Sequence, residues 1–397
     1  MRRYRSSSAK YRKGRGAKYA DKLTNDEDDD DAGIFSNESK IRYEKASSEL
    51  NVHHLSEKCE KELPVAMTGP SVEFTMGGPF SAITKSMWPQ TLASKIANGR
   101  KNVILSDSEL NETIFDTKET YDEFGYKYIG LIFPDIQVDI EGDPEPTKFT
   151  HSRIVGELTW DKVDPLLIKC DQLYALVREK GVPHSMRPYV WPRLCGAVSG
   201  KKKAAFEYKD LLKAANKDRP SVAKQIEKDL LRTMPSNACF ADFESVGVPR
   251  MRRILRAIAY LYPDIGYCQG MGVIIGTLLL FVEEEETFWL MITIIEDILP
   301  ASYFTQSLIG VQADQKVFRQ LLSDFLPGID RLLKEHDIEL SLISLNWFLT
   351  LFSSVLHVRI VLRVWDLFFY EGSVALFKVA LGESIHVELQ TLSNPHN

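Results

Sequence analysis

The stretch PRMRRILRAIAYL (residues 249–261) carries the pattern that decides the fold of this chain. Its apolar residues recur every three or four positions, which is the spacing of one face of an amphipathic α-helix. They are Met251, Ile254, Leu255, Ile258 and Leu261, and the positions between them include Arg250, Arg252, Arg253 and Arg256. Pro249 suits the first turn of a helix. We therefore predict a helix with one face in the core and one cationic face, which we interpret as solvated.

The same helical spacing extends over the C-terminal half of the chain. From Leu158 onward the apolar periodicity stays helical almost to the end, with no alternating strand pattern of useful length. Residues 317–325 repeat the spacing, and Pro327 with Gly328 ends that helix. The apolar stretch 270–282 is shorter than the roughly 20 residues that cross a bilayer, so we expect a buried helix there. The pattern predicts an all-α fold.

The composition excludes several classes of function. The 397 residues carry 49 Lys and Arg against 55 Asp and Glu, a net charge of −6, so the chain as a whole does not attract nucleic acid. The five cysteines include no CxxC pair and the eight histidines no HExxH pair, so we expect neither a disulfide framework nor a metal site. The basic N-terminus lacks the apolar stretch of a secretory signal. We expect a protein of the cytosol or the nucleus.

Charge blocks mark the N-terminal part. Residues 1–20 hold eight Lys or Arg and no acidic residue, and residues 26–31 are an unbroken acidic run. Such blocks repel themselves and usually stay unfolded, so we predict a disordered charged tail over residues 1–76. The basic block is either a solvated tail or a nuclear-import or anionic-lipid patch. Aromatic islands in turn-rich sequence predict a partly ordered extension over residues 77–180.

Two glycine patterns resemble nucleotide-binding loops but fail on spacing. GAVSGK (residues 196–201) has three residues between its glycines where a P-loop has four, and Lys202 follows where the P-loop has Ser or Thr. Gly270, Gly272 and Gly276 are one residue off the dinucleotide-binding pattern and lie in a helical region. We interpret these glycines as sites of close helix packing. We expect no nucleotide binding or hydrolysis by this chain itself.

Two short segments carry the chemistry that remains, IEKDLLRTMP (residues 226–235) and GYCQGM (residues 266–271). In the first, Arg232 lies one helical turn after Asp229, and Pro235 then ends the helix, which leaves the guanidinium in the final turn. In the second, two glycines bracket the loop, and Tyr267 and Gln269 share a face if the loop is extended. Taken singly, each segment is also typical of a surface ion pair or a polar loop.

Together these segments resemble the IxxDxxR and YxQ motifs of the TBC domain, the GTPase-activating module for Rab proteins. GVPHSMRPYVWPRLCG (residues 181–196) resembles the opening of that domain, with Arg187 and Trp191 as its R-x-x-x-W pair. The segments starting at His336 and Leu362 resemble its later helices. The resemblance covers residues 181–384 and leaves 385–397 as a divergent or truncated tail.

The resemblance implies an all-helical fold of two lobes that form a groove. It also implies that Arg232 is an arginine finger and Gln269 a glutamine finger, both acting on the GTP of a bound Rab. It assigns supporting positions to Asp229, Tyr267, Ile226, Arg187 and Trp191. GTP and Mg²⁺ are then carried by the Rab, and this chain needs no cofactor of its own.

The implied partners are Rab GTPases and possible trafficking or signalling adaptors. The implied location is cytoplasmic, with transient contact through the Rab at endosomal or other vesicle membranes. The alternative function is a non-catalytic Rab-binding scaffold in membrane trafficking.

Overall fold

The computed structural model describes residues 80–96, 124–126, 158–215 and 220–393. The all-α prediction is confirmed for them, because these ranges contain helices and an isolated antiparallel bridge, Tyr126 to Asn237, but no strand. The elements are α5 (Ser81–Met87), η1 (Trp88–Gln90), α7 (Asp171–Lys180), η3 (His184–Met186), α8 (Arg187–Leu194), α9 (Ala197–Lys203), α10 (Tyr208–Ala215), α11 (Pro220–Thr233), α12 (Gly247–Leu261), α13 (Met271–Phe281), α14 (Glu284–Thr293), η4 (Ile294–Ile298), α15 (Ile309–Phe325), α16 (Pro327–Glu335), α17 (Leu340–Leu349), α18 (Val358–Glu371) and α19 (Val374–Ser393). The predicted charged tail, residues 1–76, lies outside the described residues, and the domain boundaries stay predictions.

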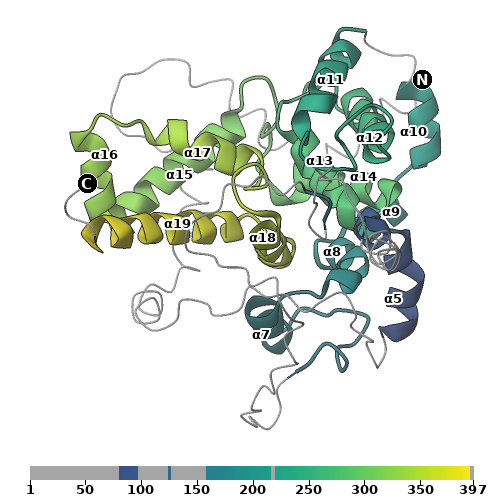
Figure 1. Cartoon of the computed structure of the whole chain (residues 1–397), viewed down its shortest axis with the longest axis horizontal. Helices are drawn as coiled ribbons and strands as arrows, with labels where there is room; N and C mark the ends of the chain where they lie inside the picture. The colour runs from purple at the N-terminus through teal and green to yellow at the C-terminus, as the bar shows by residue number, and fades with distance from the viewer. Residues whose placement is uncertain (1–79, 97–123, 127–157, 216–219, 394–397) are drawn as a thin grey trace, which may run out of the picture.

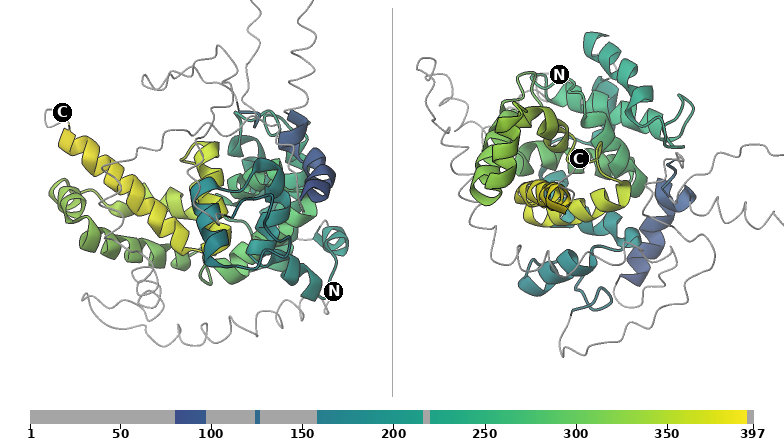
Figure 2. Two further views of the ribbon diagram at one scale, coloured as in Figure 1. Left: turned by 90° about the horizontal axis from the view of Figure 1, so that it is seen from below. Right: turned by 60° about the vertical axis from the view of Figure 1, so that its left-hand side comes forward.

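The helices form two groups. Helices α8 to α14 lie on the right in Figure 1 and α15 to α19 on the left, with α18 packed against α7 and α8. Figure 2 shows the same separation from two further sides. Within the first group α12 contacts α10, α11, α13 and α14, and within the second α19 contacts α15, α16, α17 and α18. One helix therefore organises each lobe.

Helix α12 shows how the quoted stretch builds the first lobe. Its predicted apolar positions are all buried. Its arginines form ion pairs with neighbouring helices: Arg252 and Arg256 bind Glu227 of α11 at 2.9 and 2.8 Å, and Arg253 binds Glu284 of α14 at 2.5 Å. The interpretation of the cationic face as merely solvated is therefore wrong, since this face ties α12 to α11 and α14.

Helix α13 is almost entirely buried, as predicted for the apolar stretch 270–282. A Cβ atom on Gly276 would lie 2.3 Å from Met234 Sδ, and one on Gly272 would lie 3.0 Å from Thr233 Cγ2. Such contacts are too short for most side chains, so these glycines let α11 approach α13 closely. The predicted close packing at Gly272 and Gly276 is confirmed, and it places the C-terminal end of α11 against α13.

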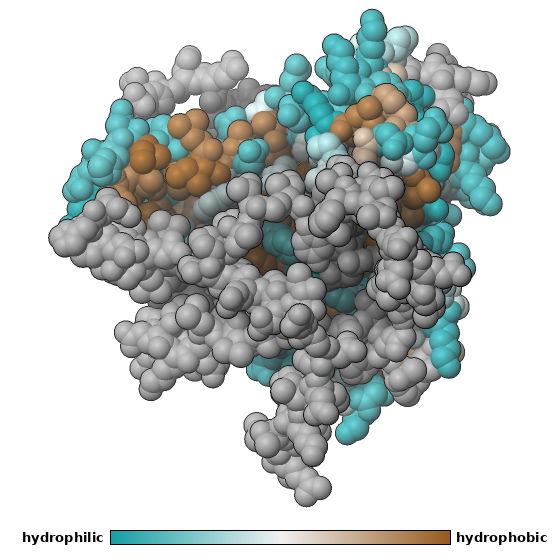
Figure 3. Space-filling model, viewed as in Figure 1, coloured by the Kyte–Doolittle hydropathy of each residue, from teal (hydrophilic) through white to brown (hydrophobic). Residues whose placement is uncertain are grey.

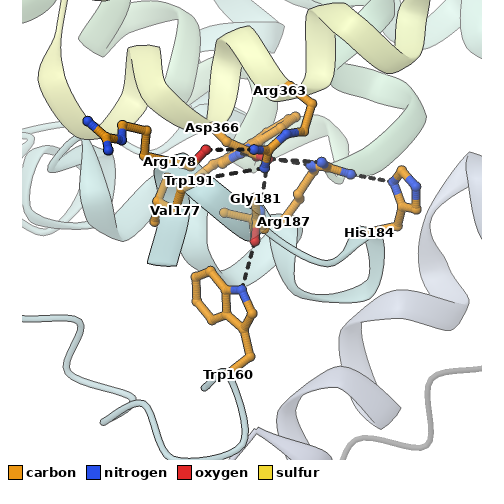
Figure 4. A network of polar contacts seen from close by, with 10 residues as sticks. Trp160, Val177, Arg178, Gly181, His184, Arg187, Trp191, Arg363 and Asp366 are labelled. Carbon is orange, nitrogen blue, oxygen red and sulfur yellow. Dashed lines mark hydrogen bonds and ion pairs between the residues drawn. The ribbon is translucent and has the colours of Figure 1, made fainter. Parts of the chain in front are cut away.

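A buried carboxylate joins the two lobes. Asp366 of α18 accepts hydrogen bonds from Arg187 Nε and Nη2, both at 3.0 Å, and from Trp191 Nε1 at 2.8 Å (Figure 4). The backbone N–H of Val182 donates to it at 2.9 Å. Arg187 is 3% exposed and Asp366 0%, so the charges compensate each other away from water.

Replacing Asp366 with Asn should destabilise the fold strongly. The change keeps the side-chain shape but leaves the buried guanidinium of Arg187 without a counter-charge, which costs about 3–5 kcal/mol of the free energy of unfolding. Urea unfolding of the full chain measures it. The control is Glu339→Gln, which removes an ion pair with Arg319 at the surface and should cost at most about 1 kcal/mol. Equal losses in both variants would contradict the account.

His184 makes the same region sensitive to pH. Its ring packs against the rings of Phe124 and Phe281, whose centroids are 5.2 and 6.0 Å away. Burial, and next the charges of Arg187 and Arg359, lower the pKa of His184 from 6.5 to about 3. The unfolded chain therefore binds a proton that the folded chain does not, and stability is lost as pH falls from 6.5 toward about 3.

His184→Gln should remove this contribution to the pH dependence. Between pH 7 and pH 5 the wild type should lose more free energy of unfolding than the variant, because only the wild type gains this proton on unfolding. Denaturant unfolding of both proteins at the two pH values measures the difference. Parallel losses would show that His184 does not titrate on unfolding in this range.

Candidate functional site

The carboxylate of Asp229 is where the two sequence motifs meet. Asp229 lies near the end of α11 and is 5% exposed. Arg232, one turn further along, binds its Oδ1 through both Nε and Nη2. Tyr267, 38 positions later in the chain, donates its hydroxyl to Oδ2 at 2.6 Å. One carboxylate therefore joins IEKDLLRTMP to GYCQGM.

Arg232 presents its charged end to solvent. Its side chain is 64% exposed, although the carboxylate that it binds is buried. Asp229 binds the edge of the guanidinium that carries Nε and Nη2. The remaining nitrogen, Nη1, has no protein partner within the part of the chain that the structure describes. Helix α11 ends at Thr233, before Pro235 as predicted, and the Thr233 hydroxyl donates to the carbonyl oxygen of Asp229 at 2.6 Å. The last turn thus aims an oriented cation outward.

Gln269 lies in a loop that two glycines shape. Gly266 and Gly270 have φ of +58° and +103°, the left-handed region that favours glycine. Gly270 is also the N-cap of α13 and packs against the end of α17, since a Cβ there would lie 3.3 Å from Thr350 Cγ2. The Gln269 side chain is exposed, and its amide has no hydrogen-bond partner among the described residues. The loop combines a constrained backbone with an accessible amide.

Tyr267 is the link between this loop and α11. Burial raises the pKa of its hydroxyl, and the hydrogen bond to Asp229 raises it further. The hydroxyl therefore stays protonated at neutral pH and remains a donor to the carboxylate. Since Tyr267 is two residues before Gln269, this bond sets the loop against the turn that carries Arg232.

The predicted supporting residues occupy two places. Asp229 and Tyr267 form one cluster with Arg232, and Ile226 is fully buried one turn before Asp229 on α11. Arg187 and Trp191 contact Asp366 instead, in the network that joins the lobes.

Asp366 is not among the residues predicted from the sequence, because the segment starting at Leu362, LRVWDLFFYEG, is interpreted there only as a later helix of the domain. The available signal is a single acidic residue inside the apolar run LRVWDLFFY, a position that requires a buried partner.

The described residues hold no group of three or more His, Cys, Asp or Glu side chains arranged to bind a metal ion. None of the helices described is both long enough and apolar enough to cross a bilayer.

Comparison with known proteins assigns the chain to a family. Residues 184–391 match the family model described as the Rab-GTPase-TBC domain, so this chain belongs to the RabGAP-TBC family. The crystal structure of a Chlamydomonas flagellar RabGAP TBC domain superposes with a TM-score of 0.51 at 29% sequence identity, covering 57% of this chain and 75% of that one.

Among individual proteins, small G protein signaling modulator 3 of Bos taurus is 50% identical over 326 residues, which is 80% of this chain and 42% of that protein. The Homo sapiens protein of the same name is 47% identical over 333 residues. TBC1 domain family member 2B of Mus musculus is 38% identical over 213 residues, or 53% of this chain. The chain spans about two fifths of the length of the modulator relatives that it matches.

Tyr267→Phe should weaken the fold around Asp229. The ring is kept, but the buried Oδ2 loses its donor, which costs about 1–3 kcal/mol of the free energy of unfolding. Chemical denaturation measures it. The matched control is Tyr370→Phe, whose hydroxyl donates to a backbone carbonyl at an exposed position. If the two variants lose the same stability, the bond between Tyr267 and Asp229 does not hold the site together.

Proposed function

We propose that this chain stimulates GTP hydrolysis by a Rab-family GTPase, with Arg232 as the arginine finger and Gln269 as the glutamine finger. Membership of the RabGAP-TBC family supports the class of activity. The observation that carries the residue assignment is the Asp229 carboxylate, which ties an exposed arginine to the loop of an exposed glutamine.

The reaction needs an added cation. Hydrolysis of GTP spreads negative charge over the oxygens of the transferred phosphoryl group, and a slow GTPase lacks a fixed positive charge there. Arginine suits this role because its planar fork can contact two phosphate oxygens and its charge is not lost at neutral pH. Asp229 holds one edge of the Arg232 fork, which leaves the Nη1 side for the partner's phosphate.

The reaction also needs an oriented water. The oxygen of a carboxamide can accept a hydrogen bond from the attacking water, and its nitrogen can donate one to a neighbouring oxygen. A fixed Gln can therefore hold that water in line. Gln269 supplies such an amide from outside the GTPase. The constrained backbone between Gly266 and Gly270 limits the positions that this amide can reach.

A macromolecular partner also fits the surface beside the loop. Leu342, Ile343 and Leu345 of α17 are 79%, 39% and 36% exposed, and Figure 3 shows apolar side chains over this lobe. The end of α17 packs on Gly270, next to Gln269. Exposed apolar patches of this kind mark protein interaction surfaces.

The remaining assignments follow from this activity. GTP and Mg²⁺ belong to the Rab, and the chain supplies side chains only. Membrane contact at endosomes or other vesicles is indirect, through the membrane-anchored Rab, and the chain otherwise stays in the cytoplasm, where trafficking or signalling adaptors are further partners.

Turnover of GTP by a panel of purified Rabs tests the proposal. On a responsive Rab, Arg232→Ala and Gln269→Ala should each lower the stimulated rate by roughly 100-fold or more, because a finger supplied in trans contributes about 10³ to 10⁵ in rate. The matched controls are Arg331→Ala, at an exposed position of α16, and Gln320→Ala, at a partly exposed position of α15, and both should keep the wild-type rate.

Two results would contradict the proposal. If both finger variants match the wild type on a responsive Rab, the assignment of Arg232 and Gln269 is wrong. If the chain binds Rabs but accelerates none of them, the non-catalytic scaffold is the better function.

A further inference from the structure

A short segment far upstream of the family domain packs on the loop that follows Arg232. Asn237, which is 0% exposed, donates from Nδ2 to the carbonyl of Phe124 at 3.0 Å. The backbone N–H of Ala238 donates to the carbonyl of Gly125 at 2.7 Å, and Tyr126 forms the antiparallel bridge with Asn237. These contacts join residues more than 110 positions apart in the chain.

The Phe124 side chain anchors this segment in the core. It is 2% exposed, and its ring lies 5.2 Å from His184 and 5.5 Å from Phe281 between centroids. His184 in turn contacts Arg187 of the network that joins the lobes. Residues 124–126 therefore bridge that network and the loop after α11.

The loop itself is short and has two anchors. Between Arg232 and Asn237 the chain turns, with the N–H of Asn237 donating to the carbonyl of Met234 at 3.1 Å. Met234 is held by its close contact with Gly276 of α13. The second anchor is Asn237, which forms a hydrogen bond and an antiparallel bridge with residues 124–126. A helix end whose following loop is fixed at two points cannot fray or swing freely.

We propose that residues 124–126, which lie outside the matched domain (residues 184–391), are a positioning element for Arg232 in GTPase activation. This inference rests on the proposed function and deepens it. The segment touches neither Asp229 nor Arg232 in any described contact. It acts by fixing the loop that continues from the last turn of α11, and so the angle at which the guanidinium projects. A displacement of about 1 Å in such a group can lower a rate by up to 100-fold.

Gly125 offers a variant that disturbs the contact of this segment with Asn237. Its backbone φ is +84°, a value that residues with a Cβ atom rarely adopt. A Cβ at this position would also lie 3.0 Å from Ile96 Cδ1 and 3.4 Å from Asn237 Oδ1. Gly125→Ala should therefore strain the contact with Asn237 without substituting any residue of the matched domain. Gly382→Ala is the control, because a Cβ at Gly382 in α19 meets nothing within 4 Å.

The experiment measures stimulated GTP hydrolysis by the full chain on a responsive Rab. Gly125→Ala should lower kcat about tenfold while the KM for the Rab changes less than about twofold, since the partner surface is untouched. Gly382→Ala should match the wild type. Amide hydrogen exchange in residues 230–238 should be faster in Gly125→Ala than in the wild type or in Gly382→Ala. This measurement does not depend on activity.

A double-mutant cycle separates positioning from a general structural effect. In an Arg232→Ala background, Gly125→Ala should cause little further loss, because the group that it misplaces is already gone. Equal fold-losses in both backgrounds, or unchanged kcat in Gly125→Ala, would overturn the inference.

If Gly125→Ala does not fold, Asn237→Asp replaces it in the same cycle. This change keeps the Oδ1 acceptor for the N–H of Cys239 but removes the donor to Phe124. Failure of the proposed function is a distinct result: Arg232→Ala then keeps the wild-type rate. Any effect of Gly125→Ala would in that case not act through Arg232, which overturns the positioning role as well.

Discussion

The candidate site depends on one buried carboxylate that accepts hydrogen bonds from two different segments of the chain. Asp229 binds the guanidinium of Arg232 on one oxygen and the hydroxyl of Tyr267 on the other. It thereby gives the end of α11 a polar connection to the loop before α13. A buried carboxylate with both oxygens occupied by donors also has few alternative arrangements, so it specifies geometry as well as charge compensation.

The close packing of α11 against α13 brings Asp229 within reach of the Tyr267 hydroxyl. Gly272 and Gly276 remove the side chains that would hold the helices apart, and Thr233 and Met234 occupy that space. On the other side of the first lobe, Asp366 draws α8 and α18 together through Arg187. The two carboxylates play parallel roles, one within a lobe and one between lobes.

Much of this could be predicted from the sequence, because the deciding patterns are local. The helical period of residues 249–261, the proline after α11 and the glycines of α13 each act within a few residues. The pairing of Arg232 with Asp229 follows from the spacing of one helical turn. The bond from Tyr267 to Asp229 joins positions 38 residues apart, and only the resemblance to a family placed the two segments in one site.

The features that escaped prediction are all long-range. Spacing along the helix could not show that the arginines of α12 meet Glu227 and Glu284, since those partners lie on other helices. The roles of Asp366 and Asn237 likewise depend on contacts with residues more than 110 positions away, and no local pattern identifies those partners.

The most direct test of the central claim is the affinity of the chain for one responsive Rab in three states: bound to GDP, bound to a non-hydrolysable GTP analogue, and bound to GDP with aluminium fluoride. An activator that is complementary to the transition state should bind the aluminium fluoride state most tightly, and Arg232→Ala should abolish that preference. Equal affinity of the wild type for all three states would contradict the account.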